Sequence, residues 1–176
     1  MNSDHSSSRT LALVGTGIFL LVAPGTVAVW VPWRISRWHV HAPFAGFTAL
    51  RVIGGVAMVA GTVVLLDAFL RFALKGMGTP APVLPPKHLV VTGSYRFVRN
   101  PMYVAVVSVI LGEALVFGDI RVFAYGLCAW LTAHIFVLFY EEPTLRRSFP
   151  EDFAEFTAHV PRWIPRLSPW QERAGS

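Results

Sequence analysis

The sequence predicts an all-α membrane protein, a polytopic bundle of about four transmembrane helices with a C-terminal amphipathic helical tail in the cytoplasm. Hydrophobic residues make up 54% of the 176-residue chain, and the mean hydropathy is +0.54. Only 14% of the residues are charged, against about 25% in an average soluble domain. The apolar residues fall in long runs separated by short polar segments, and the length suits a single membrane domain over residues 1–176.

The basic charge of the chain fits a membrane better than a nucleic acid. The formal net charge is +5, but the lysines and arginines lie between the apolar runs and do not gather on one polar face. Lipid headgroups are therefore the expected counter-charge, and no nucleic-acid partner is predicted.

The single cysteine, Cys128, lies inside an apolar run, which argues against a disulfide framework and a cysteine-based metal site. We predict no metal site.

Residues 11–31 form the first candidate span, because they are almost uncharged and long enough to cross a ~30 Å hydrocarbon core. Residues 1–10 are polar and are expected to be flexible. A cleavable signal sequence is the alternative, but its basic region would be Arg9 alone and its apolar stretch would exceed about 7–15 residues. Residues 30–38 follow and are rich in tryptophan and arginine, as is typical of a membrane–water interface.

Residues 47–74 form the second candidate span, so residues 11–75 hold the first two spans. Asp67 and Arg71 near its end are four residues apart, which lets them pair on one helical face at the membrane margin. The connector that follows, residues 76–86, contains four prolines and two glycines and cannot continue a helix.

The third and fourth candidate spans, residues 101–117 and 120–140, are predicted to form an antiparallel hairpin, because only Gly118 and Asp119 separate them. The start of the third span and the end of the fourth then lie on the same side of the membrane. With the N-terminus inside, the inner segments carry eleven lysines and arginines and the outer segments four. The positive-inside rule therefore places both termini and this side of the hairpin in the cytoplasm, as in an inner-membrane protein.

The tail from residue 143 onward has apolar residues at helical spacing with acidic residues between them. The pattern predicts one or two short amphipathic helices at the inner interface, interrupted at Pro150. The apolar positions are Leu145, Phe149, Phe153 and Phe156.

Two polar segments interrupt the apolar runs on this inner side and form the candidate functional site. The first polar segment, residues 87–103, is basic and aromatic, and the second, residues 140–142, contains two glutamates. Arg96, Arg99 and the free N–H groups at the start of the third span favour an anionic group, whereas the glutamates favour a cation. S-adenosylmethionine fits both poles, because it has a carboxylate, an ammonium and a sulfonium. The alternative is that these residues only anchor helix ends at the membrane surface.

The two segments also contain sequence motifs that resemble those of a known protein family. The first reads LVVTGSY from Leu89 and RNPMY from Arg99, the second contains Glu141-Glu142, and VPRWIP follows from Val160. This order of motifs closely resembles the isoprenylcysteine carboxyl methyltransferase family, whose near relatives are the phospholipid methyltransferases. The resemblance spans residues 87–165 and implies that this region is catalytic. It implies an integral membrane enzyme that transfers a methyl group from S-adenosylmethionine, bound from the cytoplasm, to a lipid-like acceptor from the bilayer.

The resemblance also implies which residues bind the cofactor. Glu141 would hold its methionine end, and Glu142 would be a second acidic contact. The full set is Lys87, His88, Leu89, Val90, Tyr95, Arg99, Asn100, Pro101, Met102, Tyr103, Glu141 and Glu142.

The sequence departs from the family pattern at two positions. Asn100 stands where histidine is common, and Val137 stands where the prenylcysteine enzymes have an arginine near the acceptor. The second departure leaves the acceptor open, as another lipid, a thiol, an amine or a small apolar acid. His134, one to two turns before Glu141, is a candidate general base, and a hydrogen-bonded packing role is the alternative.

Two other classes of function stay open from the sequence. Membrane sterol reductases use NADPH and resemble the C-terminal part of this chain, and the absence of a GxGxxG motif does not exclude them. A non-catalytic membrane module would bind neither cofactor.

Overall fold

The computed structural model describes residues 17–18, 21–74, 89 and 91–171. Every regular element within these ranges is helical, which confirms the all-α prediction for this part of the chain. In chain order the elements are η1 (Thr26–Trp30), α2 (Val31–Ser36), η2 (Phe44–Gly46), α3 (Ala49–Leu74), η3 (Gly93–Arg96), α4 (Pro101–Phe117), α5 (Ile120–Phe136), η4 (Val137–Glu141), α6 (Glu142–Ser148) and α7 (Pro150–His159).

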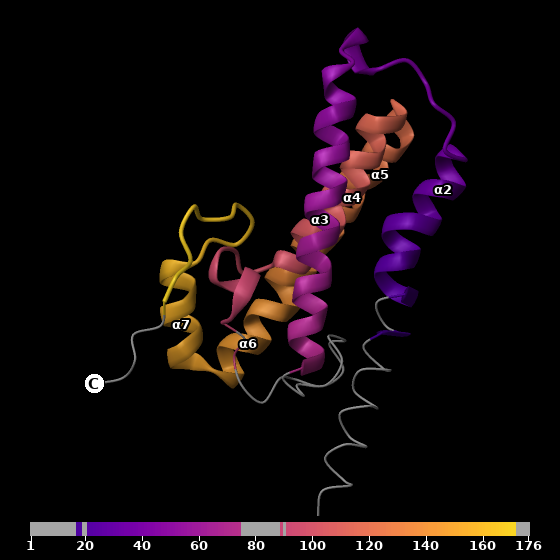
Figure 1. The fold of residues 1–176 in the computed structure, drawn as a ribbon. Helices are drawn as coiled ribbons and strands as arrows, with labels where there is room; N and C mark the ends of the chain where they lie inside the picture. Colours follow the sequence, from indigo (N-terminus) through magenta and orange to yellow (C-terminus); the bar gives the residue numbers. More distant parts are fainter. Residues whose placement is uncertain (1–16, 19–20, 75–88, 90, 172–176) are drawn as a thin grey trace, which may run out of the picture.

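The helices α3, α4 and α5 lie side by side and form the centre of the molecule (Figure 1). The N-terminal helix packs on one side of this group, against α4 and α5. On the other side, near one end of the group, lie α6, α7 and the loop after α7 (Figure 1).

The N-terminal helix contains a π-helical turn. Helical residues run from 21 to 36, with η1 in the middle and α2 at the end, so the helix extends beyond the predicted limit at Val31. The Tyr125 hydroxyl on α5 donates to the carbonyl of Val27 in this turn at 2.9 Å, which fixes the helix to the bundle. The beginning of the predicted span, residues 11–16, lies outside the described residues.

Glycines allow α3 and α4 to approach closely. A Cβ atom built on Gly54 would lie 2.6 Å from the carbonyl oxygen of Gly112, and one on Gly61 would lie 2.8 Å from that of Ala105. Helix pairs in membranes commonly pack through such small residues, because dispersion contacts drive their association.

Replacing Gly54 with valine is therefore expected to force α3 and α4 apart and to destabilise the fold by about 1–3 kcal/mol. Unfolding of the purified protein in detergent micelles measures the loss. Gly55→Val is a matched control, because a Cβ atom on Gly55 meets nothing within 4 Å. Equal losses in both variants would show that helix propensity, and not the α3–α4 contact, controls the effect.

The predicted hairpin is confirmed at its turn. Gly118, at φ 67°, ends α4 in the left-handed region that favours glycine. Asp119 precedes α5 as its N-cap and accepts a hydrogen bond from the Arg121 backbone N–H at 2.9 Å. It also accepts from the Arg121 guanidinium at 2.7 Å.

Hydrogen bonds from the Arg121 side chain lower the pKa of Asp119, so this carboxylate stabilises the fold while it is ionised. Asp119→Ala is expected to cost about 1 kcal/mol at pH 7, as for other N-cap losses. The stabilisation is complete above the ordinary pKa of 3.8 and is lost as the pH falls through the lower folded-state value. Unfolding curves at pH 7 and pH 3 should therefore show the two proteins converging in acid. A constant difference would contradict the ionised cap.

The fourth predicted span does not end at Tyr140. The helix continues from α5 through the π-helical turn η4 into α6 and ends at Ser148. Pro143 lacks an N–H and crowds the preceding turn. The wider π turn directly before it accommodates this distortion, because it places one more residue in the turn.

Within the described residues, two helices are long and apolar enough to cross a membrane, Ala49–Arg71 and Ile120–Ser148. Only 17% of the apolar window of each is buried, unlike the core helix of a soluble protein. The apolar helix α4 is shorter. The described residues thus support two full-length spans and a shorter apolar helix, whereas the number of about four spans stays a prediction.

The tail was predicted to form one or two short helices interrupted at Pro150, and it forms two, α6 and α7, the second of which begins at Pro150. Their apolar residues build a small core with two residues that precede η3 and a tryptophan near the end of the described chain. The buried members of this tail core are Phe153, Phe156, Val160 and Trp170, with Leu89, Val91, Leu145 and Phe149 packed around them. The tail therefore packs against the first polar segment and holds it in place.

Candidate functional site

The two polar segments meet, as the hairpin predicts. The Tyr103 hydroxyl, in the first turn of α4, donates a hydrogen bond of 3.0 Å to Oε2 of Glu141 at the end of η4. Tyr103 lies near the beginning of the hairpin in the sequence and Glu141 near its end. Because the two helices run antiparallel, both residues lie at the same end of the helix pair.

The second glutamate belongs to an ion-pair cluster. Glu142 accepts from Nη1 of Arg99 at 2.9 Å and from Nε and Nη2 of Arg162 at 2.7 and 2.8 Å. The side chains of Glu142 and Arg99 are each 13% exposed, so solvent screens this contact only in part. Two guanidinium groups thus bind one carboxylate, and its charge is already compensated by the protein.

Burial lowers the pKa of Arg99, and Arg162 and Arg146 lower it further by repulsion, while the Glu142 carboxylate acts in the opposite direction. The hydrogen bonds to Glu142 raise the pKa of Arg162. Both arginines remain cations at neutral pH, because a guanidinium is not deprotonated in proteins.

The loop after α7 fixes the first polar segment to the site through its backbone. The N–H of Arg99 donates to the carbonyl of Pro161 at 2.9 Å, and Nδ2 of the buried Asn100 donates to the carbonyl of Arg162 at 3.2 Å. Further along, Arg166 N–H donates to the carbonyl of Phe97 at 2.9 Å. These contacts place both arginines around Glu142.

Glu141 differs from Glu142 in having no cationic partner among the described residues. Its one hydrogen bond there comes from a neutral phenol. Tyr95 is close enough to Glu141 to be affected by its charge. Burial raises the pKa of Tyr95 well above the ordinary value, and the charges of Glu141 and Tyr103 add to the increase. Glu141 is thus an acid bordered by aromatic rings, which is an arrangement suited to a cationic ligand.

An aromatic row continues from Tyr103 toward α5. The ring of Tyr103 lies edge-on to Trp163 at 6.5 Å between centroids. Nε1 of Trp163 donates to Nδ1 of His134 at 2.9 Å, and Trp130 stacks on His134 at 5.2 Å. Trp130, Trp163 and Arg162 were not identified as site residues from the sequence. The VPRWIP motif was the feature of the sequence that could have identified Trp163 and Arg162 as site residues.

The remaining predicted site residues have packing roles or lie outside the described chain. Pro101 is buried at the start of α4, and Met102 packs against α3 through Leu65 and Phe69. Leu89 belongs to the tail core. Lys87, His88 and Val90 lie outside the described residues. For every residue of the predicted set, a contact with the cofactor stays a prediction.

A separate polar pocket of ≈ 550 Å³ lies between the end of α3 and the first polar segment. Its lining contains Arg71, Arg96 and Gly93. Arg71 is bound through Nε to both oxygens of Asp67 at 2.9 Å, which confirms the predicted pairing of these two residues. Arg96 therefore lines a different space from Arg99, although the sequence suggests that the two arginines bind the same anionic group.

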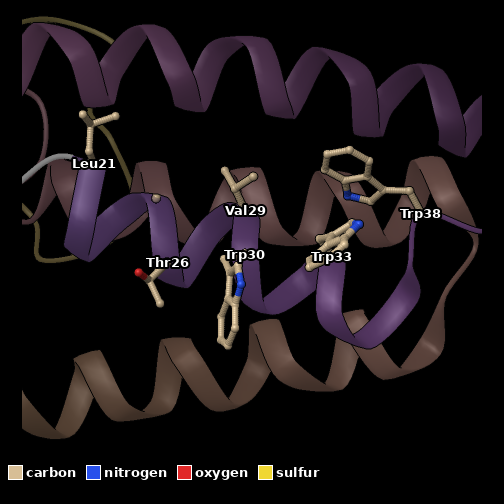
Figure 2. Close-up of a pocket in the computed structure, with 7 residues that line it drawn as sticks. Leu21, Thr26, Val29, Trp30, Trp33 and Trp38 are labelled. Carbon is tan, nitrogen blue, oxygen red and sulfur yellow. The ribbon is translucent and has the colours of Figure 1, made fainter.

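An apolar groove of ≈ 810 Å³ follows the N-terminal helix (Figure 2). Figure 2 shows Leu21, Val29 and Trp38 on the side of this helix that faces α3, whereas Thr26 and Trp30 point away from it. The groove contains no charged residue. It is separate from the Tyr103–Glu141 contact and from the ion-pair cluster, since it shares no residue with either.

The chain matches a protein-family model over much of its length. The model of the family described as phospholipid methyltransferase matches residues 50–152, which is more than half of the chain and includes Tyr103 and Glu141. No curated protein matches the chain in sequence. The family match favours the methyltransferase interpretation over the sterol-reductase-like alternative.

Proposed function

Because the chain belongs to the phospholipid methyltransferase family, and is therefore a membrane methyltransferase, we propose that it transfers a methyl group from S-adenosylmethionine to a lipid-like acceptor. The acceptor reaches the site from the bilayer, and the cofactor binds from the cytoplasm. Both termini face the cytoplasm of an inner membrane in this proposal, as the distribution of lysine and arginine suggests.

The observation that carries the proposal is the contact between Tyr103 and Glu141. Oε2 of Glu141 accepts from Tyr103, and within the described chain Oε1 receives no hydrogen bond. A carboxylate that has, among the described residues, an open oxygen, no guanidinium partner and tyrosines beside it suits an ammonium or a sulfonium. The residues present therefore fit the cationic end of the proposed cofactor.

The ion-pair cluster fixes the geometry of this site. Arg99 and Arg162 use their charge on Glu142, so the anionic end of the cofactor is left to the N–H groups at the start of α4. The cofactor supplies the reactive methyl group. The protein holds the acceptor in line with it, and such alignment can contribute about 7–11 kcal/mol to the rate.

The apolar surface suits a lipid-like acceptor. Val52, Val56 and Val63 on α3 and Leu131 and Phe139 on the long α5–α6 helix are at least half exposed. In a membrane these side chains contact acyl chains, so an acceptor with a hydrocarbon tail reaches the bundle laterally without leaving the bilayer.

Calorimetry on the full chain purified in detergent tests the cofactor assignment. We expect S-adenosylmethionine to bind and NADPH not to bind. Binding of NADPH alone would support the reductase class, and binding of neither by folded protein would support a non-catalytic module. A radiolabelled methyl donor incubated with a lipid extract would then identify the acceptor class by the product that becomes labelled.

A further inference from the structure

The hydrogen bond between Trp163 and His134 determines where the imidazole carries its proton. Nε1 of Trp163 donates to Nδ1 of His134 at 2.9 Å. An indole nitrogen is a donor only, so Nδ1 must be the unprotonated, accepting nitrogen. The neutral ring then carries its proton on Nε2.

This arrangement leaves His134 without a free basic nitrogen. A neutral imidazole takes up a proton through its unprotonated nitrogen, which here is the atom already occupied by Trp163. Stacking against Trp130, with 16° between the ring planes, holds the orientation of the ring. Within the described chain Nε2 has no hydrogen-bond partner, so its N–H is available to a ligand.

The position of His134 connects the site with the lipid-facing surface. Its neighbours on α5, Leu131 and Ile135, are 50% and 49% exposed. On its other side Trp163 contacts Tyr103, the partner of Glu141. His134 therefore lies between this exposed surface and the Tyr103–Glu141 contact.

We propose that His134 binds the methyl acceptor as a hydrogen-bond donor through Nε2–H, and not as a base, and that the acceptor carries an oxygen that accepts this bond. A carboxylate and a phosphate share this chemistry. The inference rests on the proposed function and adds the polar group of its acceptor. In this role His134 neither gains nor loses a proton.

Nitrogen NMR on the ¹⁵N-labelled full chain in detergent tests the tautomer. The ring signals of His134 are assigned by their absence in His134→Gln. We expect Nδ1 to be unprotonated and Nε2 protonated in the wild type, and a mixture of tautomers in Trp163→Phe. Protonation on Nδ1 in the wild type would overturn the inference.

Two probes, oleate in mixed micelles and phosphatidylethanolamine vesicles, test the acceptor chemistry. We expect one of the two probes to shift the Nε2 signal. A shift with oleate would identify a carboxylate as the recognised group, and a shift with phosphatidylethanolamine would identify a phosphate. His134→Gln retains an N–H donor near the position of Nε2 and should bind that probe within about threefold of the wild type, whereas His134→Leu should weaken binding at least about tenfold. No shift with either probe, or equal weakening by glutamine and leucine, would overturn the inference.

His159 provides a matched control. It stacks on Trp170 at 5.5 Å, in the same kind of contact as His134 with Trp130, but it lies exposed on α7 away from the site. His159→Leu should leave probe binding unchanged. Calorimetry with S-adenosylmethionine on the same variants separates the two proposals, because failure of the wild type to bind the cofactor would overturn the proposed function itself.

Discussion

Replacing Glu141 with glutamine is expected to reduce the affinity for S-adenosylmethionine by about tenfold to a hundredfold, because the neutral amide removes a charged contact worth about 1.5–3 kcal/mol. The shape of the side chain is kept, and the Tyr103 hydroxyl can still donate to the amide oxygen. Calorimetric titration of the purified variant measures the change.

Two further variants separate this effect from a general loss of structure. Glu155→Gln removes an exposed acid from α7 and should leave the affinity unchanged. Tyr103→Phe removes the hydroxyl but keeps the ring, and should weaken binding less than Glu141→Gln, since the charge of Glu141 remains. If folded Glu141→Gln binds as tightly as the wild type, Glu141 has no part in the cofactor site.

The contact on which this prediction rests could be derived from the sequence. A link of two residues forces α4 and α5 to run antiparallel, so residues at the start of one helix and the end of the other must meet. Tyr103 and Glu141 are separated by 38 positions and hydrogen-bonded in the structure. The structure adds the turn chemistry, which the prediction did not use: Gly118 adopts a positive φ and Asp119 caps the next helix.

The distinction between the two glutamates could not be derived in the same way. It depends on η4: in a regular α-helix Glu141, seven residues after His134, would share its face, but the extra residue in the π turn moves Glu142 onto that face instead. Because of this turn, His134 and Glu142 face the tail loop together, and consecutive residues of that loop, Trp163 and Arg162, bind them. A π turn has no periodic pattern that a sequence of apolar residues would reveal.

The role of the tail loop could not be predicted from the sequence either. Residues 160–171 form no regular helix, and they are held by isolated backbone bonds to the segment around Phe97 and Arg99. Such pairing between two irregular segments depends on the whole fold, because the segments adjoin α4 and α7, which are far apart in the sequence. Helical spacing did identify the apolar face of α7, but not its packing against Leu89 and Trp170.

The ion-pair cluster provides the second large expected effect. Glu142→Gln would leave the cations of Arg99 and Arg162 facing each other without their common carboxylate. Loss of one partner from a buried pair costs about 3–5 kcal/mol. Since Arg162 is 30% exposed and partly screened, we expect a smaller destabilisation of about 2–4 kcal/mol. Unfolding in detergent micelles measures it, and Arg147→Gln, which removes an exposed arginine from α6, is the control.

A double variant decides whether repulsion causes this loss. Adding Arg162→Gln to Glu142→Gln removes one of the two unpaired cations, so the double variant should be more stable than the single Glu142→Gln protein. The same cluster holds the loop that carries Trp163, so Glu142→Gln should also make residues 161–170 more sensitive to proteolysis. If the second substitution adds a further loss instead, the arginines do not repel each other, and Arg162 stabilises the loop through contacts other than Glu142.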